Sequence, residues 1–319
     1  DYLEAIDDIW KDATYLKTYV TGGIGSIRFH EQYGAPYELP NLSGWAETCA
    51  TFGNFVWNHR LALLNRDGRY VDMMERALYN GFLVGVSLTG DRFFYQNPLK
   101  SFGNYERFAW INVPCCPPNV VRLLASLGDY IYSQDPGGIY VNLFIASRAD
   151  VSLGGNEISL EQETNYPWDG RVRIELTPAR SDRFSVHLRV PGWTRGQPMP
   201  GELYRYLDEV DVDVTLEING EPVEAPVEQG YLSIERQWDK GDVIELDFPM
   251  PVRRVVAHDN VADDRGRVAL ERGPLVYSAE WVDNNQEVLN LLVLDDAELT
   301  AEPRQDLLNG IVAITGKVS

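Results

Sequence analysis

The sequence predicts a multidomain α+β protein in which a helical N-terminal part precedes an antiparallel β-sandwich. Up to about residue 132 the apolar residues recur at helical spacing, and after residue 135 they follow the two-residue period of a strand. The turn sequence Asp135-Pro136-Gly137-Gly138 marks the change. A length of 319 residues also exceeds the usual span of one domain. We expect a helical domain over 1–135, a β-sandwich domain over 136–282 and the beginning of a further β segment over 283–319.

Helices account for most of the expected N-terminal part. The sequence opens inside an apolar helical pattern, and apolar stripes over 52–63 and 70–81 flank the turn Asn65-Arg66-Asp67-Gly68, which indicates a helical hairpin. Another helix is predicted to begin at Pro117-Pro118, because proline is tolerated in a first helical turn, and to run to Ile131. A β-hairpin is expected over 84–95.

Short apolar or alternating runs between turn residues predict the strands of the sandwich. The expected strands are Ile139–Ile145, Val172–Leu176, Phe184–Val190, Tyr231–Ile234, Val243–Phe248 and Leu275–Tyr277.

Charge and cysteine content narrow the possible functions. A formal net charge of −20 disfavours nucleic acid as a partner, because its binding needs clustered Lys and Arg. No apolar run approaches the roughly 20 residues of a membrane span, so no membrane association is expected. The three cysteines are odd in number, and the two adjacent ones cannot form a disulfide without strain. Reduced thiols indicate a reducing compartment, and we expect a cytoplasmic protein.

Two distant segments carry groups that bind metals. Glu47 and Cys49, together with Cys115 and Cys116, offer one carboxylate and three thiolates, a donor set that suits tetrahedral zinc. The alternative is that the cysteines are merely small buried apolar residues. The cysteine pair at a predicted helix start favours zinc, because the positive end of the helix dipole stabilises thiolates.

Three further residues have both a structural and a functional interpretation. Glu31 lies on an irregular segment, where acidic residues are usually solvated. Glu75 lies at the edge of an apolar helical stripe, where it either forms a salt bridge or binds a substrate hydroxyl. Tyr95 is either a core aromatic of the hairpin or a sugar contact. The glycine-rich segment 21–26 lacks the Gly-Lys-Ser/Thr signature of a phosphate loop, so we interpret it as a tight turn that delivers the following residues to a site.

The combination of these motifs resembles the beta-L-arabinofuranosidase family, glycoside hydrolase family 127 and its relatives. The segments that carry the resemblance are Tyr19-Val20-Thr21-Gly22-Gly23-Ile24-Gly25, Glu31, Glu47-Thr48-Cys49, Cys115-Cys116-Pro117-Pro118-Asn119, Leu188-Arg189-Val190-Pro191-Gly192-Trp193 and Arg272-Gly273-Pro274-Leu275-Val276-Tyr277. The resemblance implies the C-terminal part of an (alpha/alpha)6 barrel followed by a β-sandwich, with the N-terminal part of the barrel missing.

The resemblance also implies a chemistry. Zn²⁺ is expected on Glu47, Cys49, Cys115 and Cys116, with Cys115 as nucleophile and Glu31 as general acid/base. By the same resemblance, Glu75 and Tyr95 contact the sugar. The expected activity is retaining hydrolysis that releases beta-L-arabinofuranose from an arabinose-containing oligosaccharide or glycan. Two alternatives are the same chemistry on another sugar, and a non-catalytic carbohydrate-binding or scaffold protein with a structural zinc.

Overall fold

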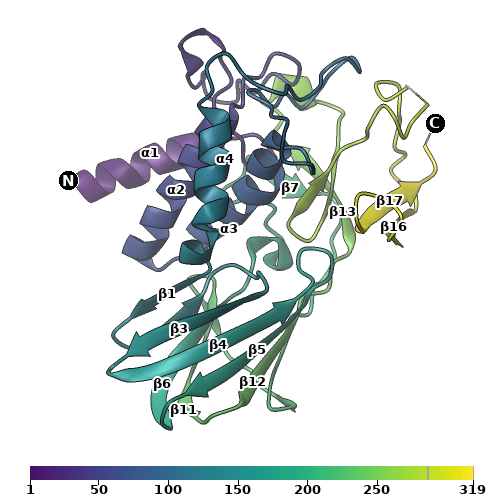
Figure 1. Ribbon diagram of the computed structural model, residues 1–319. Coiled ribbons are helices and arrows are strands. Elements are labelled where there is room, and N and C mark those ends of the chain that lie inside the picture. Colours follow the sequence, from purple (N-terminus) through teal and green to yellow (C-terminus); the bar gives the residue numbers. More distant parts are fainter. Residues whose placement is uncertain (286, 319) are drawn as a thin grey trace.

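The computed structural model describes residues 1–285 and 287–318, which form a helical part, a β-sandwich and a smaller four-stranded sheet. Figure 1 shows the helices above the sandwich, with the four-stranded sheet beside the helices and the last hairpin near the C-terminus. The irregular segments before α2 and α4 lie at the end of the helical part that faces away from the sandwich. In the described residues, no helix is long and apolar enough to cross a membrane.

The helical part is built from amphipathic helices joined by capped turns. Asp67 caps the third helix by accepting a hydrogen bond from the Arg69 amide at 2.9 Å, and Arg66 takes the left-handed conformation that ends the second. The helices are α1 (Tyr2–Leu16), α2 (Thr48–Asn65), α3 (Gly68–Arg76), η2 (Ala77–Phe82), η3 (Leu83–Gly85) and α4 (Cys116–Ala125), with short 3₁₀ turns η1 (Phe29–Glu31), η4 (Leu127–Tyr130), η5 (Gly192–Arg195) and η6 (Ala262–Asp264).

The predicted helical hairpin is present as α2 and α3, with differences at the helix ends. The apolar stripe over 70–81 passes from α3 into the π-helical turn η2. The helix predicted to reach Ile131 ends at Ala125 and continues as the 3₁₀ turn η4. The hairpin predicted over 84–95 is reduced to one pair of bridged residues, Val86 and Phe93.

The strands form four sheets in the described residues. A five-stranded sheet has the order β1-β2-β6-β11-β10, and a six-stranded sheet has the order β3-β4-β5-β12-β8-β9. A four-stranded sheet has the order β15-β14-β13-β7, and β16 pairs with β17. Their bounds are β1 (Tyr132–Asp135), β2 (Gly138–Val141), β3 (Ser147–Leu153), β4 (Asn156–Thr164), β5 (Arg171–Pro178), β6 (Asp182–Arg189), β7 (Tyr204–Tyr206), β8 (Thr215–Ile218), β9 (Glu221–Pro222), β10 (Val227–Glu228), β11 (Tyr231–Trp238), β12 (Asp242–Asp247), β13 (Val252–Ala257), β14 (Ala269–Arg272), β15 (Leu275–Tyr277), β16 (Leu299–Arg304) and β17 (Ile311–Gly316).

The sandwich is antiparallel except for one pair. Strand β2 runs parallel to β6, because the chain between them crosses to the other sheet and forms β3, β4 and β5 before it returns. The strand predicted over Ile139–Ile145 is shorter than expected, since the amides of Asn142 and Leu143 turn back to the carbonyl of Ile131. Strands β13 to β15 do not extend the sandwich but form the separate sheet with β7, so the segment 136–282 contains two β units.

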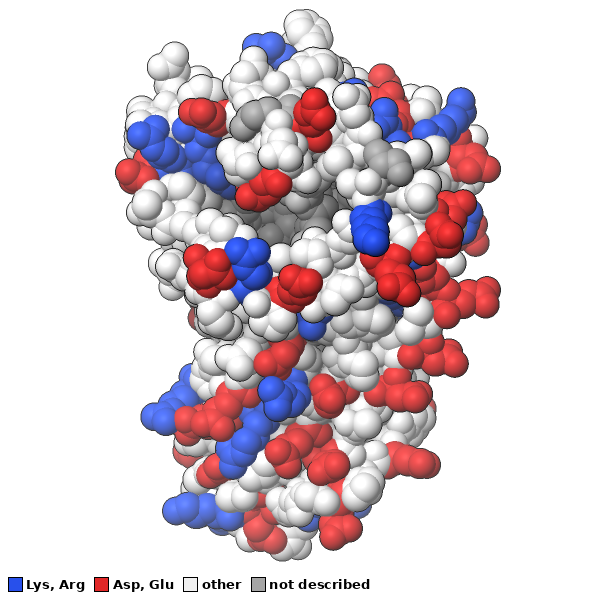
Figure 2. All heavy atoms as spheres, turned by 90° about the vertical axis from the view of Figure 1, so that its right-hand side faces the viewer, with Lys and Arg blue, Asp and Glu red and all other residues white. Residues whose placement is uncertain are grey.

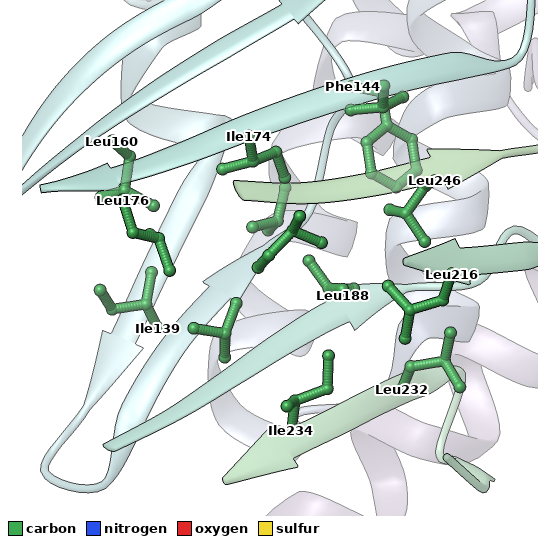
Figure 3. Close-up of a cluster of buried hydrophobic side chains, with 14 of the residues drawn as sticks. Ile139, Phe144, Leu160, Ile174, Leu176, Leu188, Leu216, Leu232, Ile234 and Leu246 are labelled. Carbon is green, nitrogen blue, oxygen red and sulfur yellow. The ribbon is translucent and has the colours of Figure 1, made fainter. Parts of the chain in front are cut away.

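The core of the sandwich consists of apolar side chains that alternate inward from both sheets (Figure 3). Ile174 and Leu188, from opposite sheets, are both fully buried. Burial of one such side chain contributes about 1.5–3 kcal/mol, so this cluster supports the sandwich as a unit of its own.

A second core joins the helices to the four-stranded sheet. Trp10 of α1 and Tyr70 of α3 belong to the same buried cluster as Tyr204 of β7 and Val255 of β13. The formal net charge is −20, and on the face in Figure 2 Asp and Glu are spread over both the upper and the lower part of the molecule. The helical part is therefore braced by apolar contacts with the four-stranded sheet.

Candidate metal centre and active site

The metal-binding residues predicted from the sequence come together at the N-termini of two helices. Glu47 is the N-cap residue of α2, and Cys49 lies in its first turn. Cys115 is the N-cap residue of α4, and Cys116 is its first helical residue. The positive ends of two helix dipoles therefore point at one cluster of acidic groups, which favours negative charge on the sulfurs.

The spacing of the four donor atoms fits a metal ion. All four lie within 4.8 Å of one another. The Sγ atoms of Cys49 and Cys116 are 3.4 Å apart, those of Cys115 and Cys116 are 3.8 Å apart, and Glu47 Oε1 lies 3.2 Å from the Cys115 Sγ. A tetrahedral ion with metal–sulfur bonds of about 2.3 Å places its sulfur ligands about 3.8 Å apart. The cluster can thus hold a metal ion with little rearrangement.

Burial shapes the protonation of these thiols. It raises the pKa of Cys115 to about 11, and the hydrogen bond to Cys116, followed by burial, raises the pKa of Cys49 above its ordinary value. Thiols with raised pKa values are protonated near pH 7, so thiolates here need a cation among them.

A residue without a predicted role orients one of the sulfurs. The side-chain amide of Asn119 donates a hydrogen bond to the Cys49 Sγ at 3.2 Å, and the Arg122 guanidinium binds the amide oxygen of Asn119. Because Asn119 lies three residues after Cys116, both face the same side of α4. That spacing, together with the polarity of Asn119, is the sequence signal that could have identified it.

Glu31 and Tyr95 lie beside the cysteine cluster. The Tyr95 hydroxyl donates a hydrogen bond to Glu31 Oε1 at 2.9 Å. After burial, the neighbouring Cys115 thiol and the Glu31 carboxylate are the next causes that raise the pKa of Tyr95. Tyr95 is therefore a neighbour of both residues with predicted catalytic roles, Glu31 and Cys115.

The backbone that carries Glu31 is strained. His30 and Glu31 have φ values of 59° and 50°, in the left-handed region that non-glycine residues rarely occupy. Such residues cost on the order of 1–3 kcal/mol each, and they cluster at functional sites. A bridge between Ile27 and Gln32 closes the loop around them.

The loop that carries Tyr95 is attached to the start of α2. The Thr48 amide donates to the Tyr95 carbonyl at 2.8 Å, and Asn97 donates to the Ala46 carbonyl at 2.9 Å. The ring of Trp45 packs edge-on against Tyr95 with the centroids 5.5 Å apart. Tyr95 is thus fixed to the same helix end that carries Glu47 and Cys49.

Glu75 forms the salt bridge that was one of its two interpretations. Its side chain is 2% exposed, at the interface between α3 and the sandwich. The Arg189 guanidinium binds its carboxylate, and the Tyr166 hydroxyl donates to the same carboxylate at 2.7 Å. A carboxylate buried and bound in this way is not available to a sugar hydroxyl, so the salt-bridge interpretation applies.

Comparisons with known proteins agree with the geometry. Three models of one family match successive parts of the chain: the beta-L-arabinofuranosidase GH127 catalytic domain over residues 1–129, the GH127 middle domain over 138–250 and the glycoside hydrolase family 127 C-terminal domain over 252–313. The non-reducing end beta-L-arabinofuranosidase of Bifidobacterium longum subsp. longum is 34% identical over 323 residues, covering 95% of this chain and 46% of that protein.

Solved structures give the same result. A GH127 beta-arabinofuranosidase superposes with a TM-score of 0.97 at 46% identity, over 99% of this chain and 50% of the other. A GH127 beta-L-arabinofuranosidase from Geobacillus stearothermophilus T6 has a TM-score of 0.88 at 41% identity, over 96% of this chain and 48% of the other. The chain therefore spans about half the length of these relatives. With its metal-binding cluster and the three successive domain matches, the chain belongs to glycoside hydrolase family 127.

Proposed function

We propose that this chain carries the catalytic centre of a beta-L-arabinofuranosidase that releases beta-L-arabinofuranose from arabinose-containing glycans with retention of configuration. The observation that supports this most is that Tyr95 neighbours both groups: its hydroxyl donates a hydrogen bond to the Glu31 carboxylate at 2.9 Å, and the Cys115 thiol is among the groups that raise the pKa of Tyr95. A retaining glycosidase needs an acid/base and a nucleophile on either side of the scissile bond, and these two groups supply that pair.

The proposed metal is zinc, held by Glu47, Cys49, Cys115 and Cys116. Three sulfurs and one carboxylate oxygen at these separations suit Zn²⁺, which prefers sulfur ligands in tetrahedral geometry. When bound, Zn²⁺ supplies the positive charge that keeps the sulfurs deprotonated at neutral pH. Asn119 supports this ligand set by its hydrogen bond to Cys49, as partners of metal ligands commonly do.

In the first step, the Cys115 sulfur attacks the anomeric carbon as the glycosidic C–O bond breaks. Glu31 gives its proton to the departing oxygen, so the aglycone leaves as a neutral alcohol. The Tyr95 hydroxyl binds one oxygen of Glu31, which leaves the other oxygen to carry the transferred proton. Half-exposed Cys115 is better placed for this attack than Cys116, which is fully buried.

In the second step, Glu31 takes a proton from water, and the water oxygen attacks the anomeric carbon. The carbon–sulfur bond breaks, and Cys115 returns to its thiolate. Two inversions at one carbon retain its configuration, and Glu31 ends the cycle protonated, as it began.

The test is the identity of the labelled residue. A reactive arabinofuranose analogue is expected to form an adduct on Cys115, located by peptide mass spectrometry, and proton NMR of early product is expected to show the beta anomer. An adduct on a carboxylate such as Glu47 contradicts the cysteine mechanism. Full turnover by a Glu31→Gln variant means that another residue supplies the proton, whereas a zinc-loaded wild-type protein without turnover favours the scaffold alternative.

We also propose that residues 1–135 contribute part of an (alpha/alpha)6 barrel. The antiparallel pair α2 and α3 with its short turn has the connection that such barrels repeat. The structure of the protein expressed together with any segment encoded upstream tests this arrangement.

A further inference from the structure

A buried ion pair joins the end of α3 to the C-terminal sheet. Arg76, the last residue of α3, is 4% exposed, and Glu271 of β14 is 1% exposed. Their side chains meet at 2.8 Å between Arg76 Nη2 and Glu271 Oε2. Neither residue contacts the cysteine cluster in the described structure, and the proposed mechanism does not use them.

The guanidinium of Arg76 also contacts the glycine-rich turn, residues 19–25. Arg76 Nη1 donates to the Val20 carbonyl at 2.8 Å, while Nη2 also binds the Pro198 carbonyl of the sandwich segment. One side chain therefore holds the glycine-rich turn, the sandwich and the C-terminal sheet together. Lysine could not replace it, because a single ammonium lacks the planar fork that serves several acceptors.

The glycine-rich turn, residues 19–25, packs closely against the end of α3. The turn is closed by hydrogen bonds from the Tyr19 amide to the Gly23 carbonyl at 2.9 Å and from the Gly22 amide back to the Tyr19 carbonyl at 2.7 Å. Gly22 has a φ of 80°, and a Cβ there would lie 2.8 Å from the amide nitrogen of Ala77. Glycine is required at this position both for its conformation and for space.

The turn connects directly to both halves of the site. The Ala46 amide donates to the Gly25 carbonyl at 2.7 Å, and Ala46 precedes the metal-binding residue Glu47. The loop that carries Glu31 begins two residues after Gly25, at the bridge between Ile27 and Gln32. The position of the turn therefore sets the position of Glu31 relative to Glu47 and the cysteines.

We propose that Arg76 and Glu271 are positioning residues, through which the C-terminal sheet holds the glycine-rich turn and so aligns Glu31 with Cys115. The proposal rests on the proposed function for the roles of Glu31 and Cys115. By this proposal the C-terminal domain of the family, matched over 252–313, contributes to catalysis, because its residue Glu271 neutralises the Arg76 guanidinium that holds the turn.

Two variants test the proposal from opposite sides. Glu271→Gln keeps the shape and removes the charge beside Arg76. Arg76→Lys keeps a positive charge beside Glu271 but loses the planar guanidinium that serves several acceptors. In Glu271→Gln the buried Arg76 has no counter-charge, which could prevent folding, whereas Arg76→Lys keeps the charge pair and is expected to fold. The matched control is Arg254→Met, which removes another ion pair of the same sheet, to Asp208 at 2.9 Å, away from the turn.

The first measurement is hydrogen–deuterium exchange of the metal-loaded full chain. Backbone amides of 19–25 are expected to exchange at least about tenfold faster in both variants, and to keep their wild-type rates in the control. Unchanged exchange over 19–25 in a folded variant overturns the proposal, because the turn would then not depend on Arg76 and Glu271.

The second measurement separates positioning from general damage. The ratio of kcat/KM for an alkyl arabinofuranoside to kcat/KM for a nitrophenyl arabinofuranoside is expected to fall about 10- to 100-fold, because kcat/KM reports the first step, in which only the alkyl leaving group needs a well-placed acid. If this ratio is unchanged while the amides of 19–25 exchange faster, the turn does not align Glu31 and that part of the proposal is overturned. If the wild-type protein cleaves neither substrate, the proposed function fails, whereas exchange still decides whether the pair holds the turn.

Discussion

Replacing Glu31 by Gln removes the proposed acid with little effect on the fold. The side chain is exposed and accepts a hydrogen bond from the Tyr95 hydroxyl, which can donate to the amide oxygen of Gln in the same way. Surface substitutions of this kind usually change the unfolding free energy by less than about 0.5 kcal/mol. A loss of activity in Glu31→Gln is therefore assigned to proton transfer and not to unfolding.

The expected loss follows from the role of a general acid. Proton transfer from a positioned side chain typically contributes about 100- to 10,000-fold in rate, or about 2.7–5.4 kcal/mol of activation free energy. We expect kcat and kcat/KM on an alkyl arabinofuranoside to fall by that factor, and kcat/KM on a nitrophenyl substrate, which reports the first step, to fall far less. Steady-state kinetics on both substrates measure the difference. Wild-type kcat on the alkyl substrate, with the fold intact by circular dichroism, would refute the assignment.

Three other variants probe the rest of the structure. Cys49→Ser is expected to bind less than one equivalent of zinc by elemental analysis, and full retention of zinc argues against the ligand set. Cys115→Ser is expected to abolish turnover and labelling even where some zinc remains, because a hydroxyl is a far weaker nucleophile than a thiolate; residual labelling at Cys116 reverses the assignment. Arg189→Met leaves the buried Glu75 carboxylate without its cation, while Asp72 keeps its contact with Arg195 at 3.4 Å, so we expect a loss of about 3–5 kcal/mol of unfolding free energy in urea titration, and a loss below 1 kcal/mol contradicts the salt-bridge account.

Periodicity in the sequence was enough to predict the main elements. The stripe over 70–81 and the alternation in strands such as Phe184–Val190 each report one buried face, and burial of one face is what stabilises an amphipathic element. The parallel pairing of β2 with β6 could not be predicted in this way, because local alternation carries no information about which strand lies next to which.

The site was predictable only in part. The ligand set could be predicted, because three thiols and a carboxylate in two short segments form a donor set that suits a metal ion. For Glu75 the sequence left two interpretations open, since a carboxylate at the edge of an apolar stripe looks the same whether a sugar or an arginine from another domain covers it. Only the tertiary structure shows that Arg189 lies opposite.

The adjacent cysteines illustrate how one step in sequence separates two roles. Cys116 begins the helical conformation of α4, is fully buried and is followed by two prolines that fix the first turn, so its sulfur is held inside the cluster. Cys115 is the N-cap residue, half-exposed and next to Tyr95. Both sulfurs can bind the metal, but Cys115 is also a neighbour of Tyr95, whose hydroxyl donates to Glu31. In the proposed mechanism, Cys116 therefore remains a metal ligand throughout, while Cys115 acts as both ligand and nucleophile at the start of the same helix.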